Sequence, residues 1–243
     1  MRLYAFSKRC AREILRDPLN LMFGIGFPVV LLLLLSAIQA NVPVPMFEIE
    51  HLTPGISVFG LAFITLFSAT LIARDRESAF LQRLYTTPLK AADYILGYML
   101  PLIPIAVVQC LVCYLVAALL GMHLTLHVIC AILSLLPVIV LYIALGLLCG
   151  SIFNVKQVGG ICGALLTNLS AWLSGIWFDL DLVGGAFQKI AKLLPFFHAV
   201  ELERSVIRGD FAQTAEHMWP VVWYGIIFSA AAIFLFLRQM KRQ

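Results

Sequence analysis

The fold is decided by residues 126–150, LHVICAILSLLPVIVLYIALGLLCG, a predominantly apolar run that contains no Asp, Glu, Lys or Arg. A helix needs about 20 apolar residues to cross a bilayer core about 30 Å thick, because each residue advances the helix by about 1.5 Å. The run is long enough for such a span. It does not alternate between apolar and polar residues as a barrel strand would, so it predicts a transmembrane helix.

Five further runs have the same character. The six runs are residues 21–40, 54–73, 95–120, 126–150, 157–178 and 219–237. Across the 243 residues, 62% are hydrophobic and only 12% are charged, whereas about 25% of a soluble domain is charged. We therefore predict an all-α integral membrane protein with six transmembrane helices.

The basic residues alternate between the loops that join these spans. All but four of the 17 lie before the first span, after the second, between the fourth and fifth, or after the sixth. Because Lys and Arg favour cytoplasmic loops, we expect a multi-pass protein of the inner (cytoplasmic) membrane with both termini in the cytoplasm. The net charge of +4 then reflects topology, and no nucleic-acid partner is expected. A cleaved signal peptide is disfavoured, because the first run exceeds the 7–15 residues of its apolar core.

Residues 1–17 form a separate segment before residues 18–243, which we interpret as a single six-span domain. Apolar residues recur at helical spacing: Leu3, Phe6, Cys10 and Ile14. Basic residues lie mostly off that stripe: Lys8, Arg9, Arg12 and Arg16. The pattern predicts an amphipathic helix in the cytoplasmic interface that faces anionic lipid headgroups and ends at Asp17. A solvated charged tail is the alternative.

The loop at residues 74–94 begins RDRESAFLQRLYTTPLKAAD. A connection between antiparallel spans needs only about 2–8 residues. A longer excursion with an apolar face beside dense charge favours a docking surface for another protein, although interfacial anchoring would produce a similar pattern.

The external stretch, residues 179–218, is too long to be structureless in a compact protein. Its apolar run at residues 186–200 is interrupted by Pro195 and is too short to span. We predict two half-helices that enter and leave the outer leaflet as a re-entrant hairpin. The alternating charges of residues 201–208 are expected to face water or a partner subunit.

Several kinds of chemistry find no support in the sequence. There is no G-x-x-x-x-G-K-[ST] phosphate-binding loop, no H-E-x-x-H metal motif and no G-x-S-x-G nucleophile motif. We expect no enzyme activity, no metal and no cofactor on this chain, and we interpret the Cys110-x-x-Cys113 pair as small apolar side chains. The spans contain no carboxylate, which disfavours a secondary transporter. A channel and a membrane scaffold stay open as further classes.

Several short motifs, in order along the spans, resemble the ABC-2 type permeases, the membrane subunits of ABC exporters in the type V arrangement. The motifs are Arg16-Asp17-Pro18, Pro54-Gly55, Arg74-Asp75-Arg76-Glu77 through Leu84, Thr87-Pro88-Leu89, and Leu194-Pro195 with Arg204 and Gly209. The R-x-R-E pattern followed by T-P-L is the most specific part. The resemblance covers nearly the whole chain.

The resemblance implies that the loop seats in a groove of a separate ATP-binding subunit and that the N-terminal helix flanks it. The implied coupling residues are Arg74, Asp75, Arg76, Glu77, Leu84, Thr87, Pro88 and Leu89. It further implies two copies of the ATPase, which would hold ATP and Mg, and a second permease chain, most simply a homodimer. Spans two and five of both protomers would line the pathway, with Phe59, Phe63, Phe67, Asn168 and Trp172 as candidates. Leu194, Pro195 and Arg204 would belong to the re-entrant segment.

The implied function is export by alternating access, driven by ATP hydrolysis on the partner. The apolar candidate wall favours a small hydrophobic or amphipathic compound of the drug or antibiotic kind. Export of a lipid-linked polysaccharide, a lipid or a peptide by the same machinery is the alternative. A secondary transporter or a channel remains the alternative from a different class.

Overall fold

The computed structural model describes residues 2–42, 44–78 and 91–240, and these residues form helices and no strand. The elements before residue 79 are α1 (Arg2–Leu15), α2 (Pro18–Leu21), η1 (Met22–Gly26), α3 (Phe27–Asn41), η2 (Pro45–Phe47) and α4 (Ile49–Glu77). After it come α6 (Ala91–Leu119), α7 (Leu126–Ile152), α8 (Val155–Val158), η3 (Gly159–Leu166), α9 (Thr167–Leu173), α10 (Leu180–Val183), α11 (Gly185–Leu193), α12 (Pro195–Arg208) and α13 (Phe211–Met240).

Five helical stretches among the described residues are long and apolar enough to cross a membrane. They are Met22–Asn41, Ile49–Glu77, Asp93–Leu119, Leu126–Ile152 and Phe211–Arg238. They confirm the all-α membrane class and match the first, second, third, fourth and sixth expected spans. The remaining expected span, residues 157–178, is helical through α8, η3 and α9, but it includes Gln157 and Asn168 and passes through the π-helical turns of η3. A sixth span stays a prediction.

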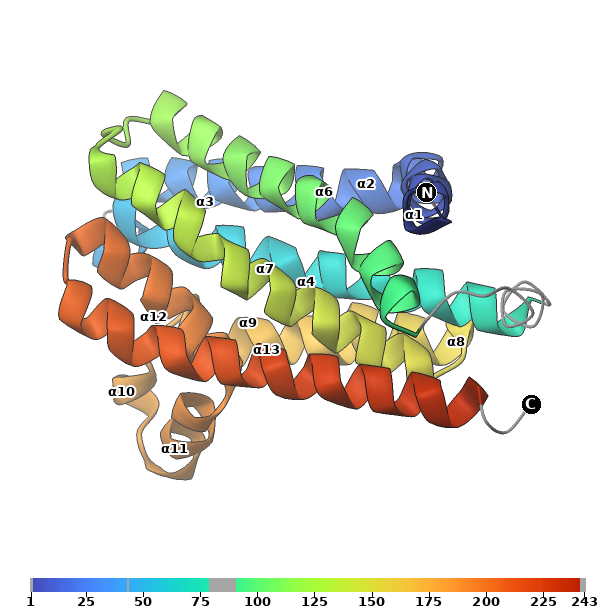
Figure 1. Ribbon diagram of the computed structural model, residues 1–243. Helices are drawn as coiled ribbons and strands as arrows, with labels where there is room; N and C mark the ends of the chain where they lie inside the picture. Colours follow the sequence, from blue (N-terminus) through green and yellow to red (C-terminus); the bar gives the residue numbers. More distant parts are fainter. Residues whose placement is uncertain (1, 43, 79–90, 241–243) are drawn as a thin grey trace.

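Helix α4 is the centre of the bundle, because 89% of its most apolar stretch of 18 residues is buried inside the chain. It packs against α7, α6, α3, α12 and η3. Figure 1 shows the long helices running side by side, with α1 and the last turns of α4 and α13 at one end and α10–α12 at the other. We call these the α1 end and the α12 end.

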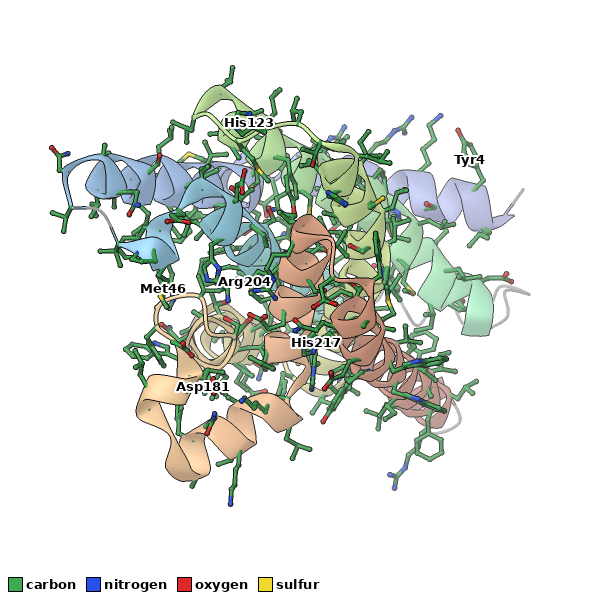
Figure 2. All side chains as sticks on the ribbon, turned by 90° about the vertical axis from the view of Figure 1, so that its left-hand side faces the viewer. Tyr4, Met46, His123, Asp181, Arg204 and His217 are labelled. Carbon is green, nitrogen blue, oxygen red and sulfur yellow. The ribbon has the colours of Figure 1, made fainter. Side chains whose placement is uncertain are left out.

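Helix α1 lies across the bundle rather than along it. Figure 1 views α1 nearly end-on, whereas Figure 2, turned by 90°, shows its length, with Tyr4 projecting outward. Its apolar stripe is buried against the bundle, with the Phe6 ring 5.0 Å from that of Tyr98. This is the orientation that an amphipathic helix takes when it lies in the plane of a membrane surface.

Helices α4 and α7 approach closely because two glycines of α7 lie against α4. A Cβ atom on Gly146 or Gly150 would collide with backbone carbonyl oxygens of α4. The close approach lets the Thr65 hydroxyl donate to the Tyr142 carbonyl at 2.7 Å and the Ser68 hydroxyl to the Ile143 carbonyl at 3.1 Å. Small residues and interhelical hydrogen bonds of this kind hold membrane helices together.

Residues 179–218 contain α10, α11, α12 and the start of α13. Leu194 separates α11 from α12, and Pro195 begins α12 in the first-turn position that a proline tolerates. Whether the pair enters a membrane stays a prediction. The expectation that all the charges of residues 201–208 face water or a partner is wrong, because Glu203 is fully buried and Arg204 is only 5% exposed within this chain. Both lie on the face of α12 that packs into the bundle.

Candidate functional site

The candidate site is built on residues 74–77, the RDRE quartet, which forms the last turn of α4 at the α1 end of the bundle. The helix continues past its apolar stretch to Glu77, and the Ser78 amide closes the final turn on the Arg74 carbonyl at 3.0 Å. The four side chains point in different directions around the helix, because successive helical residues are about 100° apart. Each of them reaches a different part of the chain.

Asp75 is the buried member of the quartet, with 2% of its surface exposed. The Arg9 guanidinium of α1 donates to both of its carboxylate oxygens, at 2.5 Å and 2.6 Å. The Tyr98 hydroxyl of α6 donates a further bond at 2.8 Å. A buried carboxylate requires such partners, since an uncompensated charge in this position costs several kcal/mol. The contact therefore fastens α1 and α6 to the end of α4.

The other three members reach the start of α2, the end of α7 and the start of α8. An Arg74 guanidinium nitrogen lies 3.6 Å from the Asp17 carboxylate. Arg76 donates to the carbonyls of Gly150 at 2.8 Å and Phe153 at 3.3 Å, in the last turn of α7 where carbonyls lack helical partners. The Glu77 carboxylate accepts from the Val155 amide at 2.9 Å, at the first residue of α8.

The quartet therefore joins five elements through four consecutive residues. Its hydrogen-bond partners lie 23–78 residues away in sequence, so the motif alone could not reveal them. The other expected coupling residues, Leu84, Thr87, Pro88 and Leu89, lie outside the described residues.

The charged residues of α1 divide into two groups. Arg9 is half-buried, and Glu13 lies 2.7 Å from its guanidinium. Burial alone would lower the pKa of Arg9, but the hydrogen bond and the charge of Asp75 outweigh it and hold that pKa above its usual value. Lys8, Arg12 and Arg16 are exposed. Within the same helix, burial raises the pKa of Cys10 to about 12, so its thiol is protonated at neutral pH.

The expected pathway residues also fall into two groups. Phe59, Phe63 and Phe67 lie on α4 and are covered by η1, α3 and their own neighbours, with ring centroids 5.8 Å apart for Phe59 and Phe63. Asn168 and Trp172 instead lie exposed on α9, and 55% of Trp172 is accessible. The structure does not bring the two groups together into one cavity within a single chain.

At the α12 end, Arg204 fastens α12 to the bundle. Its guanidinium donates to the Gly175 carbonyl at 3.1 Å and the His51 carbonyl at 3.3 Å, and pairs with Glu201 at 2.9 Å. Figure 2 looks along the bundle from this end and shows Arg204 in its middle, whereas Asp181 lies on the protruding α10. Burial would raise the pKa of Glu201, but the charges of Arg204 and Arg208 hold it below its usual value.

Glu203 is a residue that the sequence reasoning missed. Its carboxyl group accepts from the Ser134 hydroxyl of α7 at 2.7 Å and the Tyr114 hydroxyl of α6 at 3.2 Å. Burial raises the pKa of Glu203 to about 8. A signal was present, because Glu203 follows Phe196, Ala199 and Val200 at the spacing of one helical face.

Long apolar helices around a buried central helix, with charges gathered at both ends, define a multi-pass integral membrane protein. The sequence model of the ABC-2 type transporter family matches residues 1–207, and the chain belongs to that family. Among curated proteins, none matches the chain at a significant level. Family membership makes this chain a membrane permease component, of the kind that generally pairs with an ABC ATPase subunit.

Proposed function

We propose that this chain is the permease subunit of an ATP-driven exporter in the inner (cytoplasmic) membrane, with both termini in the cytoplasm. It pairs with a second permease, most simply a copy of itself, and with two copies of a separate ATPase that hold ATP and Mg. Its cargo is a small hydrophobic or amphipathic compound of the drug or antibiotic kind. The compound leaves the cell as the two protomers alternate between inward and outward access.

The observation that carries the proposal is the RDRE quartet. It begins residues 74–94, the loop that the resemblance assigns to the ATPase. A displacement of this loop acts first on the last turn of α4, where Asp75 holds α1 and α6, and Arg76 holds α7. Because separating the Arg9 guanidinium from the buried Asp75 carboxylate would leave that charge unpaired, at a cost of several kcal/mol, these helices move together. ATP-driven closure of the two ATPase subunits would thereby widen the space between the protomers.

The kind of cargo is argued from the exposed face of α9 and η3. Asn168 and Trp172 share this face with Leu165 and Leu169, which are 56% and 41% exposed. In a dimer that places α9 beside the pathway, the wall would be apolar with few polar groups. Such a wall suits hydrophobic and amphipathic molecules.

A second candidate cargo is a lipid-linked polysaccharide or another amphiphile with a large polar part. This alternative is favoured by a hollow of about 550 Å³ at the α12 end. Charged groups of both signs line it, among them Asp179, Asp181, Lys192 and Arg208. A polar headgroup would meet hydrogen-bonding partners there as it leaves.

The test is co-reconstitution of the chain with its ATPase in inside-out vesicles, with ATP hydrolysis and uptake of a fluorescent hydrophobic compound measured together. Arg76→Gln removes two bonds to α7 and should lower the amount of compound moved per ATP, while hydrolysis continues. Arg238→Gln is the matched control, since Arg238 is an exposed arginine on α13.

Two results would contradict the proposal. If Arg76→Gln moved as much compound per ATP as the unmodified chain, the quartet would have no part in coupling ATP hydrolysis to transport. Transport by the purified chain without any ATPase would instead indicate a secondary transporter or a channel.

A further inference from the structure

Two adjoining cavities lie where α1 and α2 meet α4. The first is a hollow of about 660 Å³ lined by four arginines, Arg9, Arg12, Arg16 and Arg74, together with Glu13 and Asp17. The second is a narrow groove of about 20 Å³ whose walls include Ile14, Phe67, Thr70 and Leu71. Glu13, Asp17 and Arg74 line both, so the groove adjoins the hollow.

The carboxylates of the hollow are already engaged by its own residues. Glu13 pairs with Arg9 at 2.7 Å, and Arg9 also holds the buried Asp75. Asp17 accepts from the Asn20 amide group at 2.8 Å and lies 3.6 Å from Arg74. Four arginines therefore line the hollow beside two carboxylates, and one of these arginines, Arg9, also neutralises Asp75. The excess positive charge lies on Arg12 and Arg16.

The rim of the hollow is formed by Arg12 on α1 and Arg16 in the turn that follows it, four residues apart. Both are exposed, and neither makes an ion pair within the part of the chain that the structure describes. Two guanidinium groups at this spacing converge on one anion, and guanidinium matches the geometry of a phosphate better than an ammonium does.

The order of polarity along the two cavities matches that of an amphiphile. Leu71 and Phe67 lie about one and two turns from Arg74 along α4, toward the middle of the bundle. Helix α1 lies across the bundle at this end (Figure 1), as an interfacial helix does. With α1 in the membrane interface, the charged hollow would lie at headgroup level and the groove at the level of the acyl chains.

We propose that the hollow binds the phosphate headgroup of an anionic lipid from the same leaflet. Arg12 and Arg16 hold the phosphate, and the start of one acyl chain packs against the mouth of the groove between α1 and α4. The groove is too narrow to enclose the chain, so the chain stays in contact with the surrounding leaflet. The site is independent of the proposed transport function, because it can be measured on the purified chain alone.

The experiment is native mass spectrometry of the full chain in detergent, titrated with phosphatidylglycerol or phosphatidylcholine. We expect one tightly held phosphatidylglycerol and no such phosphatidylcholine. Arg12→Gln and Arg16→Gln should each weaken retention about fivefold, the effect of one basic residue near a membrane surface. Lys8→Gln is the matched control, because Lys8 is an exposed basic residue of α1 that does not line the hollow.

Two further arms separate the headgroup from the chain. Thr70→Phe fills the groove and should lower phosphatidylglycerol retention without changing the binding of glycerol phosphate. Equal losses in Lys8→Gln and Arg12→Gln would overturn the site in favour of diffuse surface attraction. Displacement of the lipid by glycerol phosphate at equal concentration would overturn the role of the groove, and with it the assignment to a lipid.

Discussion

The contact between Arg9 and Asp75 can be tested by the substitution Asp75→Asn. Asparagine keeps the size of the side chain and removes its charge. The Arg9 guanidinium, 34% exposed, then loses both charged bonds, and the Tyr98 hydroxyl loses an ionised acceptor. Breaking a fully buried ion pair costs about 3–5 kcal/mol. Because Arg9 is partly solvated, we expect about 3 kcal/mol, which corresponds to roughly a 150-fold rise in the population with α1 detached.

Cys10 provides the assay, because it lies on the buried face of α1 with no exposed surface. Its pKa of about 12 leaves about one thiolate in ten thousand at pH 8, and only the thiolate reacts with a maleimide. Detachment of α1 exposes this thiol and returns its pKa toward the usual value. We expect alkylation of Cys10, followed by peptide mass spectrometry, to be roughly 100-fold faster in Asp75→Asn.

The control is Arg74→Gln, which neutralises a neighbouring member of the quartet. Its pair with Asp17 is long and half exposed, and such pairs contribute about 0–1 kcal/mol. Cys10 should therefore react at most about fivefold faster in this variant. The reasoning is refuted if Asp75→Asn stays folded and its Cys10 reacts no faster than in the unmodified chain.

Three further predictions concern other parts of the bundle. Burial raises the pKa of Glu203 from 4.5 to about 8. Between these two values the folded chain keeps a proton that the unfolded chain has lost. The free energy of unfolding should therefore fall by up to about 1.4 kcal/mol for each pH unit between pH 5 and 8. Glu203→Gln should flatten that slope in thermal melts, and an unchanged slope would place the titration elsewhere. Gly146→Ala puts a methyl group against a backbone carbonyl of α4 and should cost about 1–3 kcal/mol, whereas Gly159→Ala meets open space and should be neutral or slightly stabilising in the same melts. Tyr98→Phe leaves a buried Asp75 oxygen short of one donor and should cost about 1–3 kcal/mol in denaturant unfolding; no loss would mean that Arg9 alone satisfies the carboxylate.

The spans could be predicted from the sequence because their signal is local. The run at residues 126–150 predicts α7 within two residues, since apolar length alone sets where a helix can cross a bilayer. The expected span at residues 157–178 is less regular, because its glycine-rich start adopts π-helical turns that no apolar count reveals. Periodicity placed Cys10 and Ile14 on a common face of α1, and the structure buries that face.

The candidate site could be located but not assembled from the sequence. The RDRE quartet places dense charge at the end of a predicted span, and this pattern predicts a docking surface. Its actual partners, such as the Gly150 carbonyl and the Val155 amide, are backbone groups, and any residue type supplies those. Side-chain chemistry could not identify them. The burial of Glu203 was predictable in principle from its place on the apolar face of α12.

Two arginines contact α4 near its opposite ends: Arg9 binds Asp75, and Arg204 binds the His51 carbonyl. Asp75 ties one end to α1 and α6, while Arg204 ties the other to α12 through the His51 carbonyl. Between them the helix is continuous and packed on most sides. Protein interiors are too densely packed to absorb a shift by local compression. We infer that a displacement applied to the last turn of α4 reaches α12 as motion of α4 as a whole, and that loosening either arginine contact weakens this transmission.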